Sequence, residues 1–179
     1  FKLKNYFKME IGIARSLQLL LSSVLLISAL YLYLAVPDWW IYAIPCIVGG
    51  VLNVFPHSGC PFWRFFASAL IVLGTIETLF LVWSIRLVEQ SPFFTASSES
   101  SARLELFEGR LILLPALAVS LTISTRLGTG KYEGVLDALR TLLLLCFALS
   151  LVPAFAYSAT FFMPALADIV THYMEKVPF

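Results

Sequence analysis

The feature that most constrains this chain is its third apolar run, Phe65–Leu87. An α-helix rises about 1.5 Å per residue, so a helix over this run crosses a hydrocarbon core of about 30 Å. Glu77 lies near the middle, where an acidic side chain costs about 2.5–3.5 kcal/mol. Such a residue normally faces other helices or a wet cavity. Gly74 and Ser84 share its helical stripe, which predicts a helix–helix contact surface.

Composition supports a membrane protein. The chain has 179 residues, of which 60% are hydrophobic and 13% charged, whereas soluble domains are nearer half apolar and a quarter charged. We therefore predict an all-α integral membrane bundle of five transmembrane helices with a short amphipathic C-terminal helix. The predicted spans are residues 16–36, 39–55, 65–87, 104–124 and 141–163. They form a transmembrane domain, 16–163, between an N-terminal segment, 1–15, and a tail, 164–179.

Small and aromatic residues predict how the spans meet their surroundings. Gly49 and Gly50 in the second span permit close approach of a neighbouring helix. Trp63 and Trp83 lie near the two ends of the third span, as expected of an interfacial aromatic belt. Residues 56–63 and 125–140 are rich in turn-forming and polar residues, which predicts connections outside the apolar core.

Glu108 and Arg110 lie at the start of the fourth span. Its clean apolar part is too short to cross a membrane alone, so the helix must include these two residues. They are two positions apart and therefore point to different sides of the helix. Spans three and four run antiparallel across one loop, which brings Arg110 within reach of Glu77. We predict a Glu77–Arg110 contact; the alternative is that Arg110 reaches the headgroups and Glu77 is protonated.

The two ends of the chain both suit a membrane surface. Residues 1–15 carry basic groups among aromatic ones, which indicates either an interfacial segment or a simple positive flank of the first span. The tail has apolar residues at helical spacing, which predicts a short helix on the membrane surface or against a partner. These residues are Leu166, Ile169, Val170, Tyr173 and Met174.

The distribution of lysine and arginine predicts the orientation, because cytoplasmic loops carry an excess of them. With five spans, eight basic residues fall on the N-terminal side: Lys2, Lys4, Lys8, Arg15, Arg64, Arg126, Lys131 and Arg140. Four fall on the other side: Arg86, Arg103, Arg110 and Lys176. We expect the N-terminus on the cytoplasmic, matrix or stromal side of a bacterial inner or organellar membrane.

Few residues suggest bound ligands. The net charge of +1 gives no nucleic-acid footprint, and the three cysteines form no disulfide framework or CxxC site. His57 and His172 are the candidates for ligating a haem or chlorophyll metal, with ordinary interfacial roles as the alternative. His57 and Cys60 alone are too few ligands for zinc, so no metal site is predicted. No catalytic motif appears, and we expect no enzyme.

The pattern resembles the transmembrane protein 220 family over about residues 16–163. The resemblance rests on five apolar segments and short landmarks: Pro37-Asp38 ahead of Trp39, Tyr42-x-Ile44-Pro45, Glu108-Gly109-Arg110 and Leu151-x-Pro153. The family has further polar residues before its Pro-Asp, where this chain has Ala35-Val36. The resemblance implies a small helical membrane protein and assigns no activity.

Three functions are compatible with these observations. The first is an accessory or structural subunit of a larger respiratory, photosynthetic or other energy-converting complex, in contact with lipid and other subunits. The small size, the aromatic content of 15% and the amphipathic tail motivate it. The second is a small oligomeric transporter or proton-linked carrier that uses Glu77 and Arg110. The third is a lipid-modifying enzyme.

Overall fold

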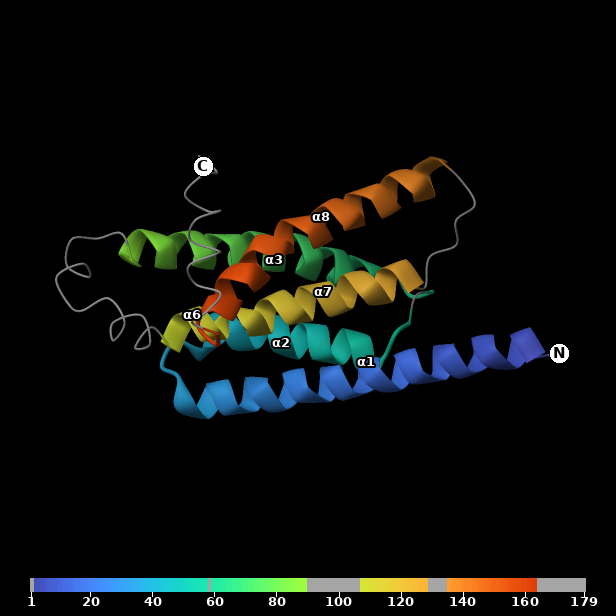
Figure 1. Ribbon diagram of the computed structural model, residues 1–179, viewed down its shortest axis with the longest axis horizontal. Helices are drawn as coiled ribbons and strands as arrows, with labels where there is room; N and C mark the ends of the chain where they lie inside the picture. Colours follow the sequence, from blue (N-terminus) through green and yellow to red (C-terminus); the bar gives the residue numbers. More distant parts are fainter. Residues whose placement is uncertain (1, 58, 90–106, 129–134, 164–179) are drawn as a thin grey trace.

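The computed structural model describes residues 2–57, 59–89, 107–128 and 135–163, and all regular secondary structure in them is helical. The helices are α1 (Lys2–Ala35), α2 (Trp39–Val54), α3 (Pro61–Glu89), α6 (Phe107–Leu111), α7 (Leu113–Gly128) and α8 (Val135–Thr160). They form an elongated bundle in which the long helices run roughly along one direction (Figure 1). The predicted all-α membrane bundle is confirmed.

Four helices are long and apolar enough to cross a membrane: Arg15–Ala35, Pro61–Leu87, Gly109–Gly128 and Asp137–Thr160. The second predicted span, α2, is shorter than these four: it has 16 residues and extends about 24 Å. Helix α1 is continuous from Lys2, so residues 2–15 and the first predicted span form one helical element. The chain is therefore a multi-pass membrane protein in which α2 is shorter than each of the four candidate spans.

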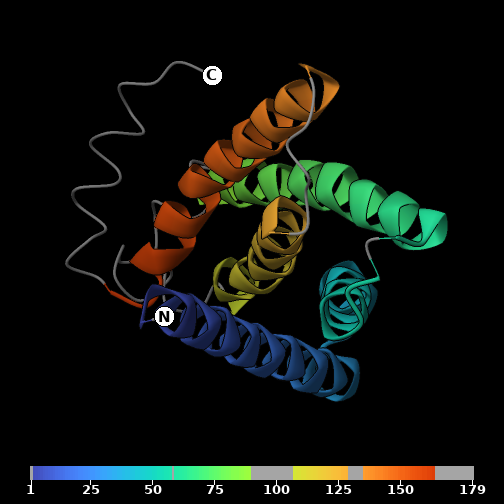
Figure 2. The same cartoon turned by 90° about the vertical axis from the view of Figure 1, so that its right-hand side faces the viewer.

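Helix α7 is the centre of the bundle. Viewed along the bundle, it lies in the middle and α1, α2, α3 and α8 surround it (Figure 2). In its most apolar stretch 56% of the residues are buried, against 22% in α1. Ala118 packs in a cluster with α1 and α2, whereas the next residue, Val119, packs with α3 and α8. Buried polar groups on α7 therefore have to bond either within α7 or to the helices around it.

The fourth predicted span is one apolar stretch broken into α6 and α7 at Ile112. Pro115 explains the break: it has no N–H to donate to the carbonyl of Leu111, and its ring crowds that carbonyl. The ladder resumes at Ala116, whose N–H donates to the carbonyl of Ile112 at 3.3 Å. This break was not predicted from the sequence.

Two glycines of α2 make the close helix contacts predicted from the sequence. A Cβ atom on Gly49 would lie 2.9 Å from the Cβ of Ala118 on α7. A Cβ atom on Gly50 would lie 2.7 Å from Cγ of Leu26 on α1. Both distances are too short for ordinary packing, so α2 touches α7 and α1 through its backbone at these positions.

The predicted belt role of Trp63 is wrong, whereas Trp83 is 47% exposed as expected. Trp63 is 7% exposed and packs with Leu52, Ala67 and Leu70. Its indole Nε1 donates to the carbonyl of Leu52 at 2.9 Å. That carbonyl is in the last turn of α2, where carbonyls lack partners within the helix. Trp63 therefore completes the end of α2 instead of facing lipid headgroups.

Both predicted connections between the spans are shorter in the structure. Helix α3 begins at Pro61, because proline at the first helical position has the required φ and no N–H to satisfy. Helix α7 continues to Gly128 and α8 begins at Val135. Residues 125–128 and 135–140 are therefore helical, which corrects the predicted connection over 125–140. The Ser-rich loop at 90–106 and the predicted amphipathic tail at 164–179 lie outside the described residues.

Candidate functional site: polar groups between the helices

A polar network joins α1, α2 and α7. Gln18 Nε2 on α1 donates to the hydroxyl of Thr125 on α7 at 2.6 Å. That hydroxyl also lies within hydrogen-bonding distance of Asn53 Oδ1 on α2. Asn53 Nδ2 donates in turn to the hydroxyl of Thr122 at 3.0 Å and to the carbonyl of Gly49 at 2.6 Å. Asn53 and Thr122 are 1% and 0% exposed, so the network is a buried one.

The spacing on α7 explains why one amide reaches two threonines. Residues three apart lie on the same face of a helix, so Thr122 and Thr125 both face α2. The hydroxyl of Thr122 donates to the carbonyl of Ala118 at 2.8 Å, which leaves its oxygen free to accept from Asn53. The close approach at Gly49 brings the two helices near enough for these bonds.

Arg126 is a second polar contact of α7, with α3. It is only 6% exposed, and its Nη1 donates to the carbonyl of Arg64 at 3.0 Å and to the hydroxyl of Ser68. Ser68 itself donates to the carbonyl of Arg64 at 2.9 Å. Arg64 and Arg140 repel Arg126 electrostatically, so three arginines share this end of the bundle.

Glu77 is half-buried in the middle of α3 and lies close enough to the buried thiol of Cys46 on α2 to act on it electrostatically. One turn earlier, a Cβ atom on Gly74 would lie 2.5 Å from Cγ2 of Val119. The predicted helix–helix contact at the Gly74 stripe is thus confirmed, and α7 is the helix that makes it.

Arg110 lies at the opposite end of the bundle from Arg126, in α6. Its guanidinium carbon is 5.9 Å from the centre of the Phe162 ring, within cation–π range. Its Nε is buried and has no hydrogen-bond partner among the described residues. The neighbouring Gly109 lets Phe161 pack against the backbone, and Ser158 donates to the Gly109 carbonyl at 3.2 Å. Helix α6 is therefore held against the end of α8.

No ion pair or hydrogen bond between Glu77 and Arg110 occurs in the described part of the chain, so the structure does not bring the predicted pair together. The two side chains have different neighbours: Glu77 lies near the thiol of Cys46 on α2, whereas Arg110 lies against the ring of Phe162 after α8. Residue spacing predicts the approximate depths of the two residues, but it does not predict which side chains they meet.

The other predicted site residues do not assemble into one site. Glu108 is within α6, but its side chain is not among those that the structure describes. His57 is exposed in the turn between α2 and α3, and His172 lies outside the described residues. In residues 2–57, 59–89, 107–128 and 135–163, no three His, Cys, Asp or Glu side chains gather in an arrangement that could hold a metal ion.

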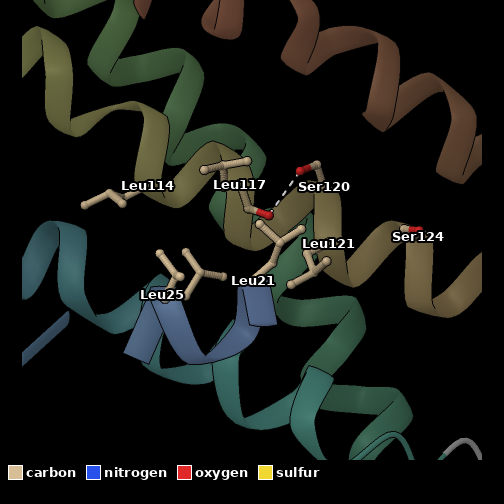
Figure 3. A pocket seen from close by; sticks show the side chains of 8 residues that line it. Leu21, Leu25, Leu114, Leu117, Ser120, Leu121 and Ser124 are labelled. Atoms are coloured by element: carbon tan, nitrogen blue, oxygen red, sulfur yellow. Dashed lines mark hydrogen bonds between the residues drawn. The ribbon is translucent and has the colours of Figure 1, made fainter. Parts of the chain in front are cut away.

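An apolar groove of about 200 Å³ lies between α1 and α7 (Figure 3). Leucines of both helices line most of it, together with Val24, Ser120 and Ser124. The Ser120 hydroxyl donates to the Leu117 carbonyl at 3.0 Å, so it is already bonded within its own helix. The groove offers hydrocarbon contact and almost no polar chemistry.

Sequence reasoning missed the roles of Gln18, Asn53, Thr122, Thr125 and Arg126. A usable signal existed, because amide and hydroxyl side chains inside apolar runs are costly unless they bond across helices. In this arrangement the amides bond to hydroxyls, and the hydroxyls bond to backbone carbonyls. Such a network fixes the register of helices, and it contains neither a carboxylate nor an imidazole that could act as a general base.

No protein-family model, no curated protein and no solved structure matches this chain. The resemblance to the transmembrane protein 220 family therefore stays a prediction from the residues.

Proposed function

We propose that this protein is a non-enzymatic accessory or structural subunit of a larger membrane complex. The observation that carries the proposal is the network in which Gln18 of α1 and Asn53 of α2 both bond to the hydroxyl of Thr125 on α7. Polar side chains that form such bonds set the register of the helices. They are then not available to bind or act on a substrate. A transporter, by contrast, needs polar groups that face a water-filled path.

The outer surface supports this proposal. Large apolar side chains are exposed along α1 and α8, among them Leu17, Ile27, Leu34, Leu142, Leu149 and Val152. In a membrane these faces meet lipid or the helices of other subunits. Respiratory, photosynthetic and other energy-converting complexes contain many small helical subunits of this kind, and they are the assemblies we expect to hold this chain.

The alternative function is that of a small oligomeric transporter or proton-linked carrier. The observation in its favour is Glu77, a half-buried acid in the middle of α3 that makes no hydrogen bond or ion pair with the described residues. Intramembrane acids without partners are typical of proton and ion paths. In this alternative Arg110 would act separately from Glu77, since no hydrogen bond or ion pair joins the two side chains in the described part of the chain.

The orientation is part of the proposal. The start of α3, the end of α7 and the start of α8 carry Arg64, Arg126 and Arg140 at one end of the bundle. The positive-inside rule puts that end, with the N-terminus, on the cytoplasmic, matrix or stromal side.

The deciding experiment is native separation of the source membranes in mild detergent, followed by mass spectrometry and an absorbance spectrum of each band that holds this chain. Co-migration with other subunits in a fixed ratio supports the subunit function, and haem or chlorophyll absorbance in that band would identify the kind of complex. Migration alone or as a homo-oligomer contradicts it. A matched preparation dissociated with dodecyl sulfate shows the mobility of the isolated chain.

A further inference from the structure

Three arginines converge at one end of the bundle from three different helices. Arg64 is three residues inside the span Pro61–Leu87, Arg140 three residues inside Asp137–Thr160, and Arg126 two residues before the end of Gly109–Gly128. At about 1.5 Å per residue, all three lie within about 5 Å of the ends of their spans. This is the depth at which an apolar core meets the lipid headgroups.

One of the three arginines is held by hydrogen bonds, and the other two are available to a ligand. Arg126 is held between α7 and α3 by its bonds to the Arg64 carbonyl and the Ser68 hydroxyl. Arg64 and Arg140 are exposed and half-exposed, and neither forms an ion pair or side-chain hydrogen bond within the described part of the chain. Asp137, one turn before Arg140, makes no such ion pair with either of them.

A nearby anion lowers the repulsion between like charges at a membrane surface. Guanidinium groups bind phosphate in a bidentate manner, and basic pockets between transmembrane helices bind anionic lipid headgroups. Below the arginines, Ile71, Ile123 and Leu144 form an apolar floor between α3, α7 and α8. Leu142 and Leu143, two and three residues deeper in α8 than Arg140, are exposed at a depth where acyl chains lie.

We propose that Arg64, Arg126 and Arg140 form a binding site for a phosphate group at the end of the α3–α7–α8 seam. The phosphate can come from an anionic phospholipid headgroup or from free phosphate. Arg64 and Arg140 bind the anion, and Arg126 contributes charge from its fixed position. The site is separate from the proposed subunit function and does not depend on it.

The test uses the full chain purified in mixed micelles with equal mole fractions of phosphatidylglycerol and phosphatidylcholine. Native mass spectrometry measures which lipid stays bound. We expect preferential retention of phosphatidylglycerol, and a loss of that preference by at least about tenfold in the double variant Arg64→Gln/Arg140→Gln. The single variant Arg64→Gln is expected to show a smaller loss, and it serves if the double variant does not fold.

The matched control is Arg15→Gln. Arg15 is exposed on α1 and is not among the charges that act on Arg126. Its replacement removes one charge, as Arg64→Gln does, but outside the cluster, and we expect the lipid preference to be unchanged. Equal retention of both lipids by the unaltered protein, or an equal loss in Arg15→Gln and Arg64→Gln, would overturn the proposal.

Inorganic phosphate distinguishes the two sources. It is added to the same micelles and compared with sodium chloride of equal ionic strength. Retention of phosphatidylglycerol in phosphate assigns the site to a lipid headgroup. Displacement of the lipid by phosphate but not by chloride, lost in the double variant, assigns it to free phosphate. Equal displacement by both salts means non-specific charge screening and contradicts the site.

Discussion

The side-chain amide of Asn53 on α2 donates to the hydroxyl of Thr122 on α7 at 3.0 Å, between two residues that are almost fully buried. The carbonyl oxygen of the Asn53 side chain lies within hydrogen-bonding distance of the Thr125 hydroxyl. That hydroxyl also accepts a hydrogen bond from Gln18 of α1. The hydroxyl of Thr125 thus ties the central helix α7 to both α1 and α2. Hydrogen bonds of this kind contribute about 0.6–2 kcal/mol each inside membranes.

Asn53→Leu is expected to lower the free energy of unfolding by about 1–2 kcal/mol, because a side chain of similar size replaces the amide without its bonds to α7. Titration with sodium dodecyl sulfate in mixed micelles, followed by circular dichroism, measures this. Ser23→Ala is the control, since Ser23 is exposed and bonds only to the Leu19 carbonyl of its own helix. We also expect Asn53→Leu and Gln18→Leu to be less than additive, because both side chains meet Thr125. Full additivity would contradict a shared network.

Gly49→Ala is expected to lower the free energy of unfolding by about 1–3 kcal/mol, because the added Cβ would lie 2.9 Å from Cβ and 3.3 Å from Cα of Ala118. The same titration measures it. The control is Gly128→Ala, at a position where an added Cβ meets no atom within 4 Å. Ala118→Gly should restore part of the loss by opening the facing helix. Equal stability of Gly49→Ala and Gly128→Ala would contradict the close α2–α7 contact.

Trp63→Phe is expected to cost about 1–3 kcal/mol, because it leaves the carbonyl of Leu52 without its buried donor. Trp83→Phe is the matched control. The substitution is the same, but Trp83 is 47% exposed, so the free energy of unfolding should change little. Tryptophan fluorescence gives a second readout. An aqueous quencher should reach the indole of Trp63 less readily than an indole at headgroup level. Strong quenching of Trp63 would show that it lies at the membrane interface.

Glu77→Gln separates the two proposed functions. It removes the charge and keeps the shape, so a subunit should still insert, and any host complex should keep its activity. A transporter should insert normally and lose flux, which a reconstituted proton-flux assay would detect. Arg110→Gln is the companion variant. Because the described residues show no hydrogen bond or ion pair between the two side chains, we expect its effect on stability to add to that of Glu77→Gln. Strong coupling between the variants would show that the pair meets after all.

Cys60 reports the orientation. It lies in the turn before α3, whereas Cys46 is buried and Cys146 is within the span Asp137–Thr160. A membrane-impermeant maleimide added outside sealed, right-side-out vesicles should leave Cys60 unlabelled until the membrane is opened. In the matched variant Cys60→Ser/Asp38→Cys, the new thiol is in the exposed turn at the other end and should be labelled at once. The reverse pattern would invert the proposed topology.

Helix content and approximate span positions follow from the sequence alone, because burying apolar runs in hydrocarbon and satisfying the backbone leave helices as the solution. The contact at Gly74 and the close approach at Gly49 and Gly50 were predicted for the same reason: small residues in an apolar helix mark where a neighbour packs. The break before α7 was also within reach, because Pro115 cannot bond to Leu111. Residues 125–128 were predicted to be part of a connection because several of them are polar or turn-forming, but they are helical.

The sequence by itself determined that this chain is a bundle of apolar helices, because length and hydropathy act along one helix at a time. Only the tertiary structure decided that α7 is central, that Trp63 faces inward, and that Asn53 rather than Glu77 links helices through hydrogen bonds. These outcomes depend on the rotation of each helix about its axis. Rotation is set by the summed packing and hydrogen bonding of several helices at once, which no single run of residues contains.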